Sequence, residues 1–167
     1  MMHKLLSAVD RRRPLPRAQA HCDIPCGIYD PSTATIAALT VIRLLDLIGE
    51  LEGKESLSLA DQAKLSRLVR EKEIHAEKAK AEVRIIWGDF FKAAQFEQYP
   101  DCHTLVHNIM LAGSACRQHI DPANGEKLLE LINQFAECFW EVKGVASYRA
   151  TSPYAPAKTV VYPDLKA

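Results

Sequence analysis

A short segment near the start of the chain carries the side chains best suited to bind a metal ion. It spans residues 21–30 and contains His21, Cys22 and Cys26, with Pro25 between the two thiols. Proline restricts the backbone, so both thiols are held within one short loop. Sulfur and imidazole donors favour nickel, copper, zinc or iron–sulfur over magnesium or calcium. We therefore expect His21, Cys22 and Cys26 to be metal ligands.

The residues before this segment decide which donor atoms it can offer. Residues 18–20 read Ala-Gln-Ala, which is similar to a cleavage site. Cleavage there would free the α-amine of His21. With the amide nitrogen of Cys22 and the thiolates of Cys22 and Cys26, this amine would complete a plane of two nitrogens and two sulfurs, and the His21 imidazole could bind axially. Such a plane suits Ni(II) or Cu(II) rather than tetrahedral Zn(II).

The charges of the chain are divided between the leader and the body. Residues 1–20 hold five basic and one acidic side chain, whereas residues 21–167 hold 16 basic and 20 acidic ones, so the total is zero. The basic leader fits either a removable pro-segment or a disordered tail. It lacks the apolar stretch of a secretory signal, and no run approaches the roughly 18–20 apolar residues of a membrane span. We expect a cytoplasmic protein with no nucleic-acid partner and no membrane partner.

The elements that must position the metal-binding segment are predicted to be helices. Apolar residues recur at helical spacing over residues 31–53, 58–90, 101–116 and 121–144, with Asp-Pro pairs before the first and last helix. Short connections between four amphipathic helices favour an antiparallel up-and-down four-helix bundle. The predicted fold class is therefore all-α, with an irregular N-terminal metal-binding hook before the bundle.

Four segments follow from these patterns. They are a removable pro-segment at 1–20, a metal-binding hook at 21–30, the helical bundle at 31–144 and an extended tail at 145–167 that could lie along a neighbouring subunit. The tail is predicted to be extended because it contains three prolines. The remaining cysteines, Cys102, Cys116 and Cys138, are interpreted as small buried hydrophobic residues, because an odd cysteine count without an export signal disfavours a disulfide framework.

Residues 21–29 resemble the nickel hook of the nickel-containing superoxide dismutase family almost letter for letter. The resemblance continues through residues 87–92, 96–100, 103–106 and 139–143, and it covers about residues 18–144. It implies a four-helix-bundle subunit in a homohexamer, with one nickel ion per subunit and a leader removed by a dedicated processing peptidase. The implied reaction converts superoxide to dioxygen and hydrogen peroxide while nickel cycles between Ni(II) and Ni(III).

The resemblance also implies roles for individual residues. His21 would supply amine and imidazole nitrogen, Cys22 an amide nitrogen and a thiolate, and Cys26 a second thiolate. Tyr29 resembles the tyrosine that lines the substrate pocket and holds water or an anion near the open axial face. Asp23, with Ile24 beside it, resembles a hook residue whose backbone shapes that pocket.

Three positions depart from the family pattern. A glutamate that orients the axial imidazole is replaced by Ala37, its supporting arginine by His75, and a second pocket tyrosine by Phe90. Loss of the carboxylate removes a partner that would fix the tautomer of the imidazole. His75 could take over by contacting His21 directly or through water.

The main alternative is a zinc site without redox activity. Cys22 and Cys26 could combine with His103 and His107, which share a helix face at a spacing of four. Two further alternatives are a bundle whose hook cysteines form a redox pair, and a helical interaction module that uses the charged helix.

Overall fold

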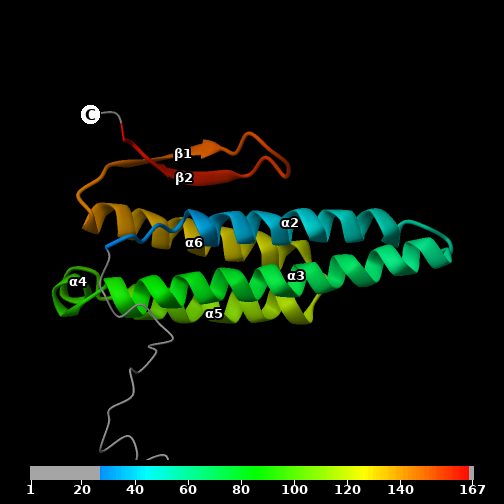
Figure 1. The fold of residues 1–167 in the computed structure, drawn as a ribbon, viewed down its shortest axis with the longest axis horizontal. Coiled ribbons are helices and arrows are strands. Elements are labelled where there is room, and N and C mark those ends of the chain that lie inside the picture. Colours follow the sequence, from blue (N-terminus) through cyan, green and yellow to red (C-terminus); the bar gives the residue numbers. More distant parts are fainter. Residues whose placement is uncertain (1–26, 166–167) are drawn as a thin grey trace, which may run out of the picture.

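The computed structural model describes residues 27–165, and this part of the chain is mostly helical. Its long helices are α2 (Ser32–Glu52), α3 (Leu59–Ile85), α5 (Cys102–Gln118) and α6 (Pro122–Val142). They lie side by side, and each runs opposite to the long helix before it (Figure 1). The helical fold prediction is confirmed to this extent. Within the described range, no helix is long and apolar enough to cross a membrane.

Side chains accept hydrogen bonds from backbone N–H groups at the starts of α2, α3 and α6. The Asp30 carboxylate accepts a hydrogen bond from the Ser32 backbone N–H at 2.7 Å, so α2 begins one residue later than predicted. Ser58 and Asp61 form a reciprocal capping box at the start of α3, and the sequence Ser-Leu-Ala-Asp at residues 58–61 is typical of such a box. The side chain of Asp121 likewise accepts a backbone hydrogen bond at the start of α6. These caps satisfy N–H groups that have no partner within the helix.

The second long helix ends earlier than the sequence predicts. The apolar pattern predicts a continuous helix over residues 58–90, but the last turn, η1 (Ile86–Phe90), is π-helical and Phe91 is extended. A short helix, α4 (Ala93–Gln98), follows. Phe91 belongs to the hydrophobic core, and Phe90 packs against it. The break allows both rings to pack inward, in edge contact at 5.3 Å.

The hydrophobic core lies between the four long helices. Its largest fully buried apolar side chains include Ile42, Leu45, Phe91, Ile109, Leu128, Ile132, Phe135 and Phe139. Four of these side chains, from Leu128 to Phe139, recur along α6 at alternating steps of four and three residues, which places them on one face of the helix. This core fixes the ends of α2, η1 and α6 relative to one another, and those ends surround the exit of the metal-binding segment.

One lysine is buried in this core and is used structurally. Lys72 is 1% exposed, and its ammonium group donates hydrogen bonds to the carbonyl oxygens of Cys116, Arg117 and His119. These carbonyls lie at the carboxyl end of α5, where they have no partner within the helix. Desolvation lowers the pKa of Lys72. The side chain therefore caps α5 from the neighbouring helix α3.

The end of the chain folds into a β-hairpin instead of remaining a plain extended tail. Strands β1 (Ser147–Thr151) and β2 (Thr159–Pro163) pair antiparallel, and the hairpin lies against α2 and α6 (Figure 1). The Asn133 side chain donates to the Thr159 carbonyl at 3.0 Å and accepts from the Val161 N–H at 3.1 Å. Val160 is 1% exposed. The sequence interpretation missed this because the anchoring residues lie on α6, far from the hairpin in the chain.

Ion pairs add to this attachment of the hairpin. The Arg149 guanidinium binds the carboxylates of both Glu130 and Glu137 on α6, at distances of 2.6 to 3.1 Å. Lys158 pairs with Glu126 on the same helix. Because these groups are partly exposed, each pair is worth less than a buried contact. Together they attach β1 and the residue just before β2 to α6.

Candidate metal centre

The predicted metal ligands His21, Cys22 and Cys26 lie outside the described residues, as does Asp23. Their assignment stays a prediction from the sequence. The structure does describe where the metal-binding segment joins the helical body, from Gly27 onward. The following side chains therefore surround the exit of the segment.

Residues 27–30 lead into the start of α2 (Figure 1). The contacts of Gly27 with Lys143 and of Tyr29 with Phe90 place these residues beside the end of α6 and η1. Gly27 has a backbone φ of +71°, a conformation that favours glycine over residues with a side chain. Its carbonyl oxygen accepts a long hydrogen bond, 3.5 Å, from Lys143 Nζ. The chain immediately after Cys26 is thus tied to the end of α6, 116 residues away.

Tyr29 is half-buried and packs on an aromatic cluster at the same end of the molecule. Its ring lies 5.8 Å from the ring of Phe90, which in turn lies 4.8 Å from the ring of Phe139. The π-helical turn of η1 supplies Phe90, and α6 supplies Phe139. The predicted pocket residue Tyr29 therefore sits on Phe90, the residue that replaces the second family tyrosine.

Lys143 is a site residue that the sequence interpretation did not single out. Its ammonium group lies over the Phe90 ring, 4.9 Å from the ring centre, and 5.8 Å from the centre of Phe139. A cation above an aromatic face is attracted to the ring electrons by about 0.5–1 kcal/mol at an exposed site. In the sequence, Lys143 is distinguished only as the last residue of 139–143, a stretch that resembles the family. Lys143 brings a positive charge to the exit of the metal-binding segment.

Two of the positions that differ from the family pattern, Ala37 and His75, lie on the neighbouring helices α2 and α3. Ala37, on α2, is 1% exposed and offers no hydrogen-bonding side-chain atom. His75, on α3, is half-buried, and its Nδ1 lies 2.9 Å from the Glu71 carbonyl oxygen. A carbonyl oxygen only accepts, so Nδ1 carries the proton, and in the neutral ring Nε2 is an acceptor. His75 is therefore equipped to receive a hydrogen bond from another donor.

The histidines of the zinc alternative have other surroundings. His103 and His107 are exposed. His103 Nδ1 accepts a hydrogen bond from Trp87 Nε1 at 3.1 Å, and its ring stacks on Phe96 at 4.2 Å. Among residues 27–165, no group of three or more His, Cys, Asp or Glu side chains is placed to hold a metal. The zinc interpretation is not supported.

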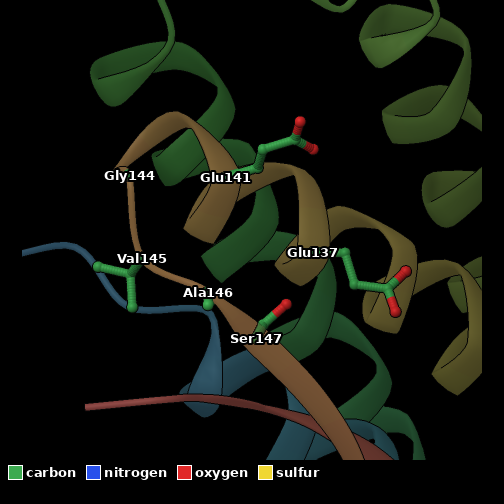
Figure 2. A pocket seen from close by; sticks show the side chains of 6 residues that line it. All are labelled: Glu137, Glu141, Gly144, Val145, Ala146 and Ser147. Carbon is green, nitrogen blue, oxygen red and sulfur yellow. The ribbon is translucent and has the colours of Figure 1, made fainter. Parts of the chain in front are cut away.

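An open pocket near the end of α6 is acidic. It is about 310 Å³ in volume, and Glu137 and Glu141 line it from α6 beside the connection of residues 144–147 to β1 (Figure 2). Its lining includes no cation. Carboxylates disfavour an anion, so Lys143 is better suited than this pocket to receive an anionic substrate.

The comparisons with known proteins agree on one family. The sequence model described as nickel-containing superoxide dismutase matches residues 16–143. The chain is 38% identical over 130 residues to "Superoxide dismutase [Ni]" of Streptomyces seoulensis, covering 78% of this chain and 93% of that protein. It is 40% identical over 124 residues to the protein of the same name from Streptomyces coelicolor, covering 74% and 88%.

Solved structures give the same result. A crystal structure of Ni-containing superoxide dismutase with nickel ligation corresponding to the oxidised state matches with a TM-score of 0.65 and 40% identity, covering 74% of this chain and 99% of that one. The native structure of a nickel superoxide dismutase matches with a TM-score of 0.64 at the same identity and coverage. The family match ends at residue 143, so the C-terminal hairpin lies outside it.

A helical body that carries an N-terminal segment rich in sulfur and nitrogen donors defines the class as a metalloprotein. Within that class, the chain belongs to the nickel-containing superoxide dismutase family.

Proposed function

We propose that this protein converts superoxide to dioxygen and hydrogen peroxide with one nickel ion per subunit. The observation that carries the proposal is the family match over residues 16–143, which includes the whole donor set of residues 21–30. The balanced reaction takes two superoxide ions and two protons to one dioxygen and one hydrogen peroxide. The nickel ion supplies one-electron redox chemistry, between Ni(II) and Ni(III), when bound.

The donor set fits nickel in its chemistry. After cleavage before His21, the chain would offer an amine, an amide nitrogen and two thiolates from His21, Cys22 and Cys26. Thiolate and anionic amide donors raise the electron density at a metal and so favour a higher oxidation state. The leader would keep the site unmade until a processing peptidase removes residues 1–20.

The side chains around the exit of the segment would handle the substrate. Lys143 supplies the positive charge that an anion needs near an otherwise acidic body. The hydroxyl group of Tyr29 would hold water or the anion, with the ring supported by Phe90. Phe90 stands in place of the second pocket tyrosine and has no hydroxyl group. Water would therefore deliver the two protons.

If the His21 imidazole binds the metal, it would need a partner that orients its ring, and Ala37 has no side-chain atom that could serve. We infer that His75 provides it, with Nε2 accepting a hydrogen bond from the ring of His21 directly or through water. Asp23 would act through its backbone by shaping the pocket. This arrangement would replace the carboxylate-based support seen in the family pattern.

The assembly belongs to the same proposal. The four long helices would form the up-and-down bundle of the family, preceded by the nickel hook, and six subunits would form a cytoplasmic homohexamer. The opposite direction of successive long helices and the similarity to nickel superoxide dismutase structures support the bundle. The hexamer and its location rest on the family resemblance of the sequence.

The proposal is tested by comparing forms of the protein that begin at different residues. The protein should be prepared beginning at His21, beginning at Ala20 and with the full leader, and each form assayed for nickel content and superoxide dismutation. We expect activity only in the form that begins at His21. Equal activity of the form that retains residues 1–20 would overturn the mechanism.

Cysteine variants provide the matched control. Cys22→Ser and Cys26→Ser should abolish dismutation and nickel binding while the helical circular-dichroism signal persists. Cys116→Ala removes a thiol that is 0% exposed inside the body and should retain both properties. Full activity of the Cys22 or Cys26 variant would contradict the assignment of these ligands.

A further inference from the structure

An aromatic pocket lies between the C-terminal hairpin and the start of α2. Its volume is about 170 Å³, and its walls come from α6, the hairpin and the chain at Asp30. The aromatic side chains in these walls are Trp140, Tyr154 and Tyr162. The two tyrosines lie beyond the family match, which ends at residue 143. The hairpin therefore gives this chain a pocket that is built partly outside the family match.

Contacts within the body hold the three aromatic residues in place. The Trp140 ring is half-buried, and its centre lies 5.0 Å from the centre of the buried Phe139 ring. The Tyr162 ring lies 5.9 Å from the ring of Tyr148 on the paired strand. Hydrogen bonds to the carbonyl oxygen of Tyr154 fix its backbone in the loop of the hairpin. The walls of the pocket are thus held by the protein itself, which lowers the entropic cost of binding.

The size and the charge of the pocket favour the side chains of a peptide. Sites for drug-sized molecules usually measure about 300–1,000 Å³, so a volume of about 170 Å³ suits one or two side chains. Aromatic walls bind the proline rings of polyproline II segments, and they also attract cations. Asp30 is the only charged residue that lines the pocket in the described part of the chain. Its carboxylate favours a basic group beside the proline ring.

The leader contains a segment with this chemistry. Residues 13–17 read Arg-Pro-Leu-Pro-Arg. Proline fixes its own φ and restricts the residue before it to extended conformations, so this sequence favours polyproline II. That helix has three residues per turn, which places Pro14 and Arg17 on the same edge, about 9 Å apart. One edge of the segment therefore presents a proline ring followed by a cation.

The leader joins the body beside the pocket. Gly27, the first described residue, precedes Asp30 by three residues, and Asp30 lines the pocket. Residues 18–26 separate Arg17 from Gly27, and they can span at most roughly 35 Å. Closing a loop of this length costs little more than closing a shorter flexible one. The same chain can therefore supply the segment that fills the pocket.

We propose that residues 14–17 of the leader dock in this aromatic pocket while the leader is still attached. The Pro14 ring enters between the aromatic side chains, and the Arg17 guanidinium pairs with the Asp30 carboxylate. Residues 18–29 then form a loop that contains both the predicted cleavage site and the predicted metal ligands. The role of the leader as a pro-segment rests on the proposed function, whereas the docking requires only the full chain.

Cleavage before His21 would release the leader. In the intact chain the linker keeps the segment at an effective concentration in the millimolar range. After cleavage the same contact is intermolecular, so a weakly bound leader dissociates when the protein is at micromolar concentration. The pocket would hold the leader before processing and lose it afterwards.

The first test locates the leader in the full chain. Leu15 is replaced by photoreactive benzoylphenylalanine, and the cross-links formed on irradiation are mapped by peptide mass spectrometry. We expect cross-links to the pocket residues Trp140, Tyr154 or Tyr162, and none of them when Leu5 is replaced instead. Protein assembled from isotope-labelled and unlabelled chains separates links within one chain from links between chains. Cross-links elsewhere on the body, or only between chains, would overturn the proposal.

A matched pair of variants tests the wall of the pocket. Tyr154 is 49% exposed in the loop of the hairpin, so Tyr154→Ser removes an aromatic ring without opening the core. It should lower the yield of the Leu15-site cross-link by about fivefold or more. Leu111→Ser changes a side chain that is 57% exposed on α5, outside the pocket, and should leave the yield unchanged. Equal yields in the two variants would refute the assigned site.

The second test supplies the leader as a separate peptide. A fluorescent peptide of residues 9–20 is titrated with nickel-loaded protein beginning at His21, and binding is followed by anisotropy. Asp30→Asn keeps an oxygen that can accept from the Ser32 N–H but removes the charge, and it should weaken binding by about fivefold or more. The control is a peptide of the same composition in which no arginine stands three residues after a proline. Equal binding of both peptides, or no binding at millimolar protein, would overturn the proposal.

Dismutation is measured on the same nickel-loaded protein to separate the two proposals. Cross-links and peptide binding at the pocket without dismutation would refute the proposed function alone. Active enzyme whose leader neither cross-links to the pocket nor binds it as a peptide would refute the docking alone.

Discussion

The ammonium group of Lys143 lies 4.9 Å from the centre of the Phe90 ring, and it also donates a hydrogen bond to the carbonyl of Gly27. One side chain from the end of α6 therefore links the π-helical turn to the first described residue after the predicted nickel ligands. A cation at this point has two physical roles. It fixes the base of the metal-binding segment, and it attracts an anion toward it.

Replacing Lys143 by Met should weaken the attraction of superoxide. We expect kcat/KM to fall by about threefold to tenfold at low salt, because electrostatic steering raises association rates by at least tenfold in favourable cases. The dependence of kcat/KM on ionic strength, measured by pulse radiolysis, should become shallower. Lys127→Met changes an exposed lysine near the start of the same helix and should leave both measurements unchanged. Equal effects of the two variants would refute a local role.

Replacing Tyr29 by Phe should separate packing from hydrogen bonding. The ring contact with Phe90 would be retained, so the melting temperature should change little. Loss of one hydroxyl hydrogen bond should lower kcat/KM by about twofold to tenfold, equivalent to about 0.5–1.5 kcal/mol. The control is Tyr148→Phe, on the half-exposed face of the hairpin. An unchanged kcat/KM in Tyr29→Phe would remove the hydroxyl from the mechanism.

Replacing His75 by Leu should alter the bond of the His21 imidazole to nickel and leave the donors of Cys22 and Cys26 unchanged. Nickel content should be retained, while the nitrogen hyperfine pattern in the electron paramagnetic resonance spectrum of Ni(III) should change, because the acceptor for the His21 ring is lost. His75→Gln keeps an acceptor oxygen and should restore part of the signal. Identical spectra for the wild type and both variants would show that His75 does not orient His21.

Replacing Asn133 by Leu should loosen the C-terminal hairpin. Two hydrogen bonds to the hairpin backbone would be lost from a residue that is 2% exposed, so the free energy of unfolding in urea should fall by about 1–3 kcal/mol. Amide hydrogen exchange at Val161 should accelerate. Gln134→Leu, on the exposed neighbour, should alter stability by less than about 0.5 kcal/mol. Unchanged hydrogen exchange in Asn133→Leu would show that the ion pairs of Arg149 are enough to hold the hairpin on α6.

The capping box of α3 should make stability fall in acid. Hydrogen bonds from Lys54 and Ser58 lower the pKa of Asp61 from 3.8 to about 2. A depressed pKa in the folded state means that the stabilisation is complete above pH 3.8 and is lost as the pH falls through about 2. Asp61→Asn should therefore flatten the decline of the free energy of unfolding between these values, as measured by urea titrations at each pH. A parallel decline in variant and wild type would exclude Asp61 as its source.

Local chemistry explains what could be derived from the sequence. The donor set of His21, Cys22 and Cys26 depends on residue type and spacing within a few positions, and the family match includes all three. Helix positions followed from apolar periodicity, and the capping box of Ser58 and Asp61 was visible as a four-residue pattern. These features are local because each depends on backbone groups within one or two helical turns.

Contacts between distant parts of the chain could not be derived in this way. Periodicity predicted a continuous α-helix through Phe90, but the structure has a π-helical turn over Ile86–Phe90 that ends at the extended Phe91. The prolines of the last segment predicted an extended chain, and only Asn133 and the carboxylates of α6 determine that it pairs and docks as a hairpin.

The sequence by itself determined which atoms could bind nickel and that a helical body would follow them. Only the tertiary structure decided that Lys143 lies over Phe90 beside Gly27, and that Asn133 on α6 binds the backbone of the C-terminal hairpin. The physical reason is that these neighbours are separated by many residues and come together only when the apolar faces of the helices pack into a shared core.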